Sequence, residues 1–287
     1  MEVLDAIVDE VALEGLDGIT IPALWLRLQA RVPPFPLLLD EATKEFIWQS
    51  LAVHPELEFY ELPVERQPLV LSNRYEGIDC DPVVLKAKGG PCSEDIYPIH
   101  IISENKDGIQ GSCQFFEERI LVTDQLRMHT FTCEQVFERW GEKLLIVGSQ
   151  ALRLRALIGW EGDPTVLLPD CSYCILEKLG RSRWQGELQR DLQGSFKVDA
   201  GKIHYLRRAL DRNGLITMQS HIIKLSNGTQ QHSLLLLLKR FHIDRRNKYD
   251  MLSEKVSALL SECENQIETL INLREELGVH ERIFKRL

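Results

Sequence analysis

An Asn-Gly dipeptide between two apolar runs most constrains the fold of this chain. Asn227-Gly228 separates residues 215–225 from residues 230–240, and both runs are rich in residues that favour strands. Asn-Gly readily adopts the positive φ angles of a tight turn, so we predict a β-hairpin turning at residues 226–228. Three helical segments are predicted before it, at residues 172–179, 184–192 and 199–212. Three helices closed by a hairpin are typical of a winged helix, a variant of the helix-turn-helix.

The same order of elements is predicted near the N-terminus. Residues 3–11 carry apolar side chains at helical spacing, residues 21–28 form a second short helix, and a third begins at Asp40, a typical N-cap. Residues 57–60 then alternate as a strand. When Asp40 is aligned with Asp199, Ile47 meets Leu206 and Leu51 meets Leu210, although Lys44 falls opposite Ile203. This match indicates an internal repeat of one fold.

The fold class is therefore predicted as mainly α with small β-hairpins (α+β), built from tandem winged helices. A Pro- and Gly-containing stretch and a short α/β pattern separate the two repeats. Apolar helical spacing continues after the second repeat. We predict a winged-helix-like domain at 1–63, an extended linker at 64–95, a small α/β or irregular segment at 96–168, a basic winged helix at 169–250, and the helical start of a truncated further winged helix at 251–287.

Charge is divided unevenly along the chain. The whole sequence holds 34 Lys and Arg against 43 Asp and Glu, a net charge of −9. Residues 170–250 hold 15 basic and 8 acidic side chains, whereas residues 1–169 hold 14 and 28. A basic segment inside an acidic chain indicates a polyanion as the partner of that segment. The second winged helix is thus the part expected to bind nucleic acid.

The third helix of the basic winged helix is predicted to carry a cationic face. A helix advances about 100° per residue, so placing Ile203, Leu206 and Leu210 inward turns the polar side chains outward. In helix-turn-helix proteins this outward face enters the major groove, where Arg bonds guanine and other side chains reach bases or phosphates. The predicted DNA-binding residues on this helix are Lys202, His204, Tyr205, Arg207, Arg208 and Arg212.

Further DNA contacts are predicted on either side of that helix. Arg181, Arg183 and Gln185 are expected at the start of the second helix, where Arg and backbone amides hold a phosphate. Lys197 precedes the third helix, and Lys224 lies beside the hairpin tip, where a wing approaches the DNA backbone.

The first repeat lacks this cationic face. Under the same alignment, Glu45 and Val53 occupy the positions of His204 and Arg212. A helix with these residues repels or ignores phosphates. We therefore expect the first winged helix to bind protein or to pack internally.

Motifs of an enzyme are missing from the sequence. It contains no phosphate-binding Gly-Lys-Ser/Thr loop, no H-E-x-x-H and no nucleophile elbow. Cys171 and Cys174 form the one close cysteine pair, and no second pair follows at zinc-finger spacing. We expect no catalysis, cofactor, metal or small-molecule substrate. The lack of a long apolar run and of a basic leader predicts an intracellular chain without a membrane span.

Long strings in the basic winged helix resemble one family. Residues 170–192, which begin Asp-Cys-Ser-Tyr-Cys, and residues 196–202, Phe-Lys-Val-Asp-Ala-Gly-Lys, are similar to the B-block-binding domain of the largest subunit of general transcription factor IIIC. Residues 120–132 depart from the family pattern. Shorter strings extend the resemblance over nearly the whole chain, at residues 11–18, 104–112, 156–159 and 161–164.

The resemblance implies a nuclear, DNA-binding subunit of a multisubunit complex. That family recognises the internal B-box promoter element of tRNA-type genes and supports assembly of the RNA polymerase III initiation complex. The implied partners are double-stranded DNA and the other subunits of transcription factor IIIC. A second function class stays open: a winged-helix scaffold for protein interactions within a transcription complex, with little DNA contact of its own. The acidic first 169 residues favour that alternative for their half of the chain.

Overall fold

The structure is a computed structural model that describes residues 3–71, 84–85, 108–129, 131–159, 162–163, 166–224, 230–242 and 248–279. The chain divides into two compact units. The first holds Met1–Ser72, Gly90–Ser220 and Ser233–His242, and the second holds Asn73–Gly89, His221–His232 and Ile243–Leu287. Each unit is described by itself.

The first winged helix contains the predicted elements in the predicted order. They are α1 (Val3–Ala12), α2 (Ile21–Gln29), α3 (Glu41–Ala52) and β1 (Leu57–Glu61). The Asp40 carboxylate accepts a hydrogen bond from the Thr43 amide at 2.8 Å, which caps α3 as expected. Trp48 and Phe59 meet edge to face in the core, with ring centroids 5.6 Å apart.

The sheet of the first winged helix takes a strand from a distant part of the chain. β1 pairs antiparallel with β4 (Leu144–Gly148), and Ile19 forms a bridge with Ile146 on the other side of β4. A short strand, β3 (Ile120–Leu121), pairs with the free side of β1. We had predicted a separate segment at 96–168, and the structure differs because β4 completes the first winged helix. A buried apolar run in the sequence indicates a strand, but it does not show which other strand pairs with it.

Helices from the middle of the chain also belong to the first unit. They are α4 (Thr123–Met128), α5 (Cys133–Trp140) and α6 (Gln150–Ile158), and the short 3-10 helix η1 (Gly141–Lys143) leads from α5 into β4. α5 begins at a capping box formed by Thr132 and Gln135. Most of the linker predicted at 64–95 and the first residues of the segment predicted at 96–168 lie outside the described residues.

The second winged helix follows the same plan. Its elements are α7 (Asp170–Ser182), the 3-10 helix η2 (Arg183–Gln185), β5 (Glu187–Leu188), α8 (Gln189–Phe196), α9 (Ala200–Arg212), β6 (Ile216–Lys224), β7 (Gln230–Leu238) and the 3-10 helix η3 (Lys239–Phe241). The predicted strands on both sides of the hairpin are confirmed, and their turn lies outside the described residues. Asp199 caps α9 by accepting from the Lys202 amide at 2.9 Å.

The helix predicted at 184–192 is wrong in its first half. Glu187 and Leu188 instead form β5, which pairs antiparallel with Leu236 and Leu235 of β7. Gly186 allows this close approach, because a Cβ there would lie 2.5 Å from the Leu236 carbonyl oxygen. β5 is stabilised by its pairing with β7, a strand that is distant in sequence.

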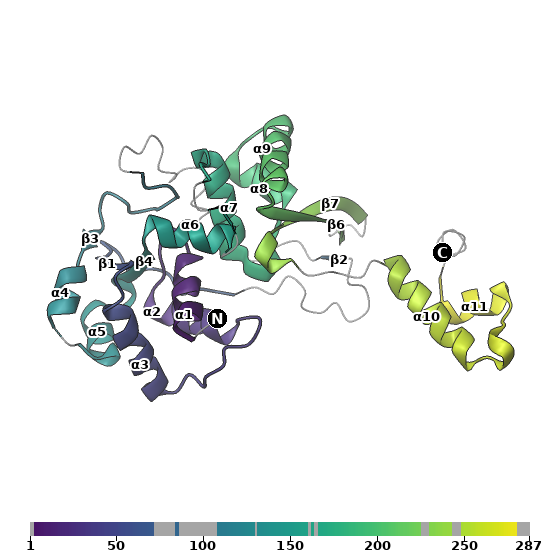
Figure 1. The fold of residues 1–287 in the computed structure, drawn as a ribbon, viewed down its shortest axis with the longest axis horizontal. Helices are drawn as coiled ribbons and strands as arrows, with labels where there is room; N and C mark the ends of the chain where they lie inside the picture. The colour runs from purple at the N-terminus through teal and green to yellow at the C-terminus, as the bar shows by residue number, and fades with distance from the viewer. Residues whose placement is uncertain are drawn as a thin grey trace. The chain divides into compact units, whose positions relative to one another are not determined.

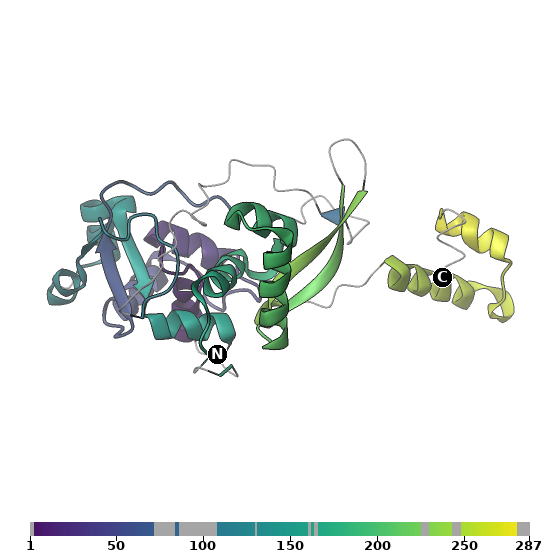
Figure 2. The ribbon, with the colours of Figure 1, turned by 90° about the horizontal axis from the view of Figure 1, so that it is seen from above.

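The two sheets share one strand order. In the second winged helix the order is β2-β6-β7-β5, with β2 at Val84–Leu85. In the first it is β3-β1-β4, followed by the bridge at Ile19. The inner strands thus keep one order, as expected for tandem winged helices, whereas the outer strands differ, since β3 is antiparallel to β1 and β2 is parallel to β6. Figure 1 labels the helices and strands of both winged helices, and Figure 2 shows the same ribbon from above.

The second unit contains the C-terminal helices. α10 (Lys248–Glu262) and α11 (Leu270–Leu277) are joined through η4 (Glu264–Gln266), and Gly278 ends α11 in a left-handed conformation. In the same unit β2 runs parallel to β6, with Val84 opposite Ile222. The further helix expected after Gly278 lies outside the described residues. None of the described helices has the length and apolar character needed to cross a membrane.

Candidate nucleic-acid interface

The α9 helix has the two faces that the sequence predicted. Ile203, Leu206 and Leu210 are buried in the core at 1%, 8% and 1% exposure. Figure 1 shows α9 beside α8. The opposite face therefore meets solvent and could meet a duplex. Its exposed side chains are Lys202, His204, Tyr205, Arg208 and Arg212.

Arg207 is more constrained than its exposed neighbours on α9. The residue is half-buried, and its Nη1 donates to Gln189 Oε1 at the start of α8 over 2.7 Å. Its Nη2 contacts His204 Nδ1 at 2.9 Å. The side chain thus connects α8 with the exposed face of α9. The sequence predicted Arg207 as a DNA-binding residue, and the structure gives its guanidinium two partners within the protein.

The candidates that flank α9 occupy different environments. Lys197 is exposed at the end of α8, where its φ of 50° is left-handed. Lys224 ends β6 in the second unit, and its side chain lies outside the described residues. Gln185 is half-buried in η2 rather than at the start of a helix. Arg190 was missed: it is exposed in the first turn of α8, and only its charge marked it in the sequence.

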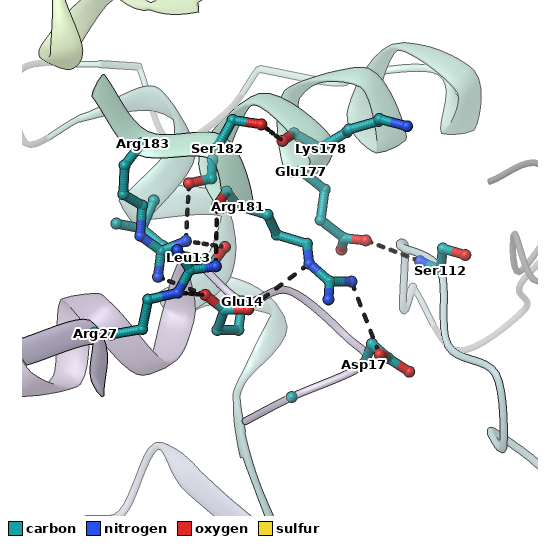
Figure 3. A network of polar contacts seen from close by, with 12 residues as sticks. Leu13, Glu14, Asp17, Arg27, Ser112, Glu177, Lys178, Arg181, Ser182 and Arg183 are labelled. Carbon is teal, nitrogen blue, oxygen red and sulfur yellow. Dashed lines mark hydrogen bonds and ion pairs between the residues drawn. The ribbon is translucent and has the colours of Figure 1, made fainter. Parts of the chain in front are cut away.

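Arg183 does not lie on a DNA-accessible surface, so its prediction as a phosphate contact is wrong. Its residue is 6% exposed, and its Nη2 lies 2.9 Å from Glu10 Oε2 and 2.8 Å from Glu14 Oε1. Its guanidinium also donates to the carbonyls of Leu13 and Gly180 (Figure 3). The local sequence showed a cation near a helix start, but the acidic partners come from α1 and the loop after it.

Two further arginines of the second winged helix contact acidic residues of the first. Arg181 lies 3.7 Å from Glu14 and 3.8 Å from Asp17. Arg240 donates to both carboxylate oxygens of Asp9, at 2.7 and 2.6 Å. Part of the charge contrast between the two halves is therefore neutralised inside the molecule. The positive charge available to a duplex is smaller than the residue count suggests.

These contacts centre on a group of six residues from both winged helices. We call it the α1–α7 ion cluster, and Figure 3 shows most of its members. It joins the two winged helices through buried charges of opposite sign, so removal of one member would leave a buried charge without its partner. Its members are Glu10, Glu14, Asp17, Arg27, Arg181 and Arg183.

Glu14 is ionised at the middle of the α1–α7 ion cluster. Its burial by itself would raise the pKa, but the charges of Arg27, Arg183 and Arg181 outweigh burial and hold the pKa at about 2. Burial likewise opposes the charge of Arg183, but Glu14 and Glu10 raise its pKa above the usual value. Both side chains therefore stay charged at neutral pH.

A second buried carboxylate also joins the two winged helices. Glu177 of α7 is 1% exposed and accepts from the amides of Leu16 and Ser112, at 3.2 and 3.0 Å. Arg153 approaches it to 3.8 Å. A Cβ on Gly15 would lie 2.5 Å from the Glu177 side chain, so this approach depends on glycine. Within the first unit the helices of the two repeats therefore pack against each other, which the sequence repeat alone did not indicate.

The equivalent face of the first winged helix is covered by the chain itself only in part, since Phe46 and Val53, which align with Tyr205 and Arg212, are exposed. Glu45, which aligns with His204, accepts from the Cys133 amide at 2.7 Å. Gln49 and the buried Trp48 donate to the Phe131 carbonyl, at 3.1 and 2.9 Å. The start of α5 therefore packs on the part of α3 that would enter a groove. This packing agrees with the expectation that the first winged helix packs internally.

Two family models match the chain. The model described as "B-block binding subunit of TFIIIC" matches residues 169–244, which include α7 to β7. The model described as "General transcription factor 3C polypeptide 1, winged-helix domain" matches residues 1–104. Among the described residues, no group of three His, Cys, Asp or Glu side chains could hold a metal ion.

Curated relatives match over the whole chain. Proteins named General transcription factor 3C polypeptide 1 are 61% identical in Homo sapiens and 60% identical in Mus musculus and Rattus norvegicus, each over 100% of this chain. The chain spans only 14% of the length of each relative.

Proposed function

Because this chain belongs to the family of general transcription factor 3C polypeptide 1, we propose that its second winged helix binds double-stranded DNA at the B-block promoter element. The observation that carries this proposal is the two-faced α9 helix. Its apolar residues are buried, and Lys202, Arg208 and Arg212 are exposed on the other side. We propose α9 as the helix that enters the major groove.

The proposed interface is smaller than the set predicted from the sequence. Arg208 and Arg212 are one helical turn apart on α9, so both can face the same stretch of duplex. Arg183 is left out because it is buried, and Arg181 because it faces Glu14 and Asp17. Lys224 remains a separate proposal in the second unit. The proposed interface consists of Lys197, Lys202, His204, Tyr205, Arg208 and Arg212, with Arg207 as their support.

We propose that the first winged helix takes part in protein contacts rather than DNA contacts. At the positions of His204, Tyr205 and Arg212 its α3 face carries Glu45, Phe46 and Val53, of which Glu45 accepts from the Cys133 amide and the other two are exposed, so these positions offer phosphates no cation. Other subunits of transcription factor IIIC are the proposed partners, and the nucleus is the proposed location. A scaffold role for the whole chain is the alternative, and the internal neutralisation of Arg181, Arg183 and Arg240 favours it.

A binding titration distinguishes these two functions. The full 287-residue chain is titrated with a B-block duplex and with a scrambled duplex of equal composition, at two salt concentrations. We expect Arg208→Ala to weaken B-block binding by about 1–3 kcal/mol if the side chain contacts a base. Lys44→Ala is the matched control, since it removes one cation from the equivalent helix α3. Equal affinity of the unsubstituted chain for both duplexes would support the scaffold instead.

A further inference from the structure

We infer that Arg207 does not read DNA itself but positions His204, whose Nε2 donates a hydrogen bond to an acceptor on a base edge. This inference rests on the proposed function, because it assigns roles within the proposed α9 interface. The connected side chains are Gln189, Arg207 and His204, which we call the α8–α9 relay.

The hydrogen bonds of the α8–α9 relay can run in only one direction, from donor to acceptor. A guanidinium only donates, so Arg207 donates Nη1 to Gln189 Oε1 at 2.7 Å and Nη2 to His204 Nδ1 at 2.9 Å. His204 Nδ1 must therefore carry a lone pair. The ring proton then sits on Nε2, at the far end of the imidazole. The protein thus sets His204 as a donor before any DNA arrives.

Exposure separates the roles of the three residues. His204 is exposed, whereas Gln189 and Arg207 are half-buried. Two donor groups of Arg207 are already used within the protein, and they link the first residue of α8 to α9. Arg208 and Arg212 are exposed on the same helix. Arg207 is accordingly a positioning residue, and the neighbouring arginines are the groups that can contact a duplex.

Among the described residues of the two repeats, this relay occurs in the second. In the first winged helix, Trp48 aligns with Arg207 and Glu45 aligns with His204. Glu45 there accepts from the Cys133 amide, so the position presents an acceptor to its own chain. The second repeat instead presents a donor to solvent. This difference follows the division of function proposed for the two repeats.

A fixed donor restricts the base that it can face in the major groove. Purine N7, guanine O6 and thymine O4 accept hydrogen bonds there, whereas cytosine offers an amino donor. Two donors facing each other would leave both unpaired, which is unfavourable in a desolvated interface. The ligand of His204 is therefore a base-edge acceptor, and cytosine is disfavoured at that position.

The test compares variants of the full chain on the B-block duplex and the scrambled duplex. Loss of one hydrogen bond corresponds to about a fivefold rise in Kd. We expect this rise for His204→Ala and for Gln189→Ala on the B-block duplex, with unchanged Kd on the scrambled duplex. The double variant should bind no more weakly than His204→Ala alone. Gln189→Glu keeps the acceptor for Arg207, so it should retain B-block discrimination.

Modified duplexes identify the acceptor. Single 7-deazapurines remove N7 from one base, and single cytosine replacements, each paired with guanine, remove the major-groove acceptors from the base on that strand. One position should weaken binding of the unsubstituted chain but not of His204→Ala. A response to the 7-deazapurine there assigns N7, and a response to cytosine alone assigns guanine O6 or thymine O4.

Two results would overturn the relay. One is additive effects of Gln189→Ala and His204→Ala. The other is an Arg207→Met variant that weakens binding to both duplexes equally and reduces the salt dependence of binding as Arg212→Ala does. Arg207 would then contact phosphate. Failure of the proposed function gives a different result: the unsubstituted chain would not discriminate between the duplexes at all.

Discussion

Replacing Arg183 with methionine tests whether the α1–α7 ion cluster holds the two winged helices together. Methionine keeps most of the side-chain length, so the change removes charge and hydrogen bonds rather than volume. It leaves Glu10 and Glu14 without a cation that lies 2.9 and 2.8 Å away. The φ of 52° at this position is left-handed, and methionine is no better suited to it than arginine. Backbone strain therefore stays the same in the comparison.

The expected loss of stability depends on the cations that remain beside Glu10 and Glu14. Removing one partner of a buried ion pair typically costs about 3–5 kcal/mol. Glu14 keeps Arg27 at 2.8 Å, and Glu10 keeps Arg31 at 3.2 Å. These contacts limit the loss to the lower end of that range. We therefore expect the free energy of unfolding of the first unit to fall by about 3 kcal/mol.

Urea unfolding followed by circular dichroism measures this loss. A decrease of that size lowers the melting temperature by roughly 6–12 °C for a unit of this size. Glu41→Gln is the control, because it removes the ion pair of Glu41 with Lys44 on the surface, where Glu41 is 92% exposed. That variant should unfold like the unsubstituted chain. A decrease below about 1 kcal/mol for Arg183→Met would refute the structural role assigned to the cluster.

Three other measurements check separate parts of the structure. Acid should destabilise the first unit as pH falls from about 4.5 toward 2, because Glu14 has a folded pKa of about 2 and the unfolded chain takes up its proton first. The free energy of unfolding of Glu14→Gln should depend less on pH over that window. An equal pH dependence of the two chains would contradict the low pKa of Glu14. Asp199→Ala should cost about 1 kcal/mol through loss of the α9 cap, measured by urea unfolding, whereas Asp199→Asn should retain most of that stability. Gly186→Ala should lower the melting temperature, because its φ is +63° and its Cβ would meet the Leu236 carbonyl, and an unchanged melting temperature would contradict the close approach of β5.

Arg183→Met also separates stability from DNA contact. The residue is buried, so its substitution should leave the salt dependence of DNA binding unchanged under conditions where the variant is folded. Arg212→Ala should reduce that dependence by about one unit if the side chain contacts phosphate. Arg183→Met is therefore expected to change stability but not the salt dependence of DNA binding, whereas Arg212→Ala is expected to change the salt dependence. The sequence predicted both arginines as DNA contacts.

The sequence predicted the features that depend on nearby residues. The caps at Asp40 and Asp199 act over three residues, and the buried face of α9 follows from helical spacing. The hairpin strands follow from two apolar runs on either side of Asn-Gly. These features are local, so the order of residues along the chain was enough to determine them. Much of the proposed α9 interface could be predicted for the same reason.

Only the tertiary structure decided which distant surfaces meet. β4 pairs with β1, the start of α5 covers α3, and Arg183 is paired with Glu10 at a separation of 173 residues. A residue count treats every arginine as available to a polyanion, because it carries no information on burial. Burial depends on the packing of one winged helix against the other, and charge neutralisation follows from that packing. Sequence therefore determined where cations occur, and the fold determined which of them can reach DNA.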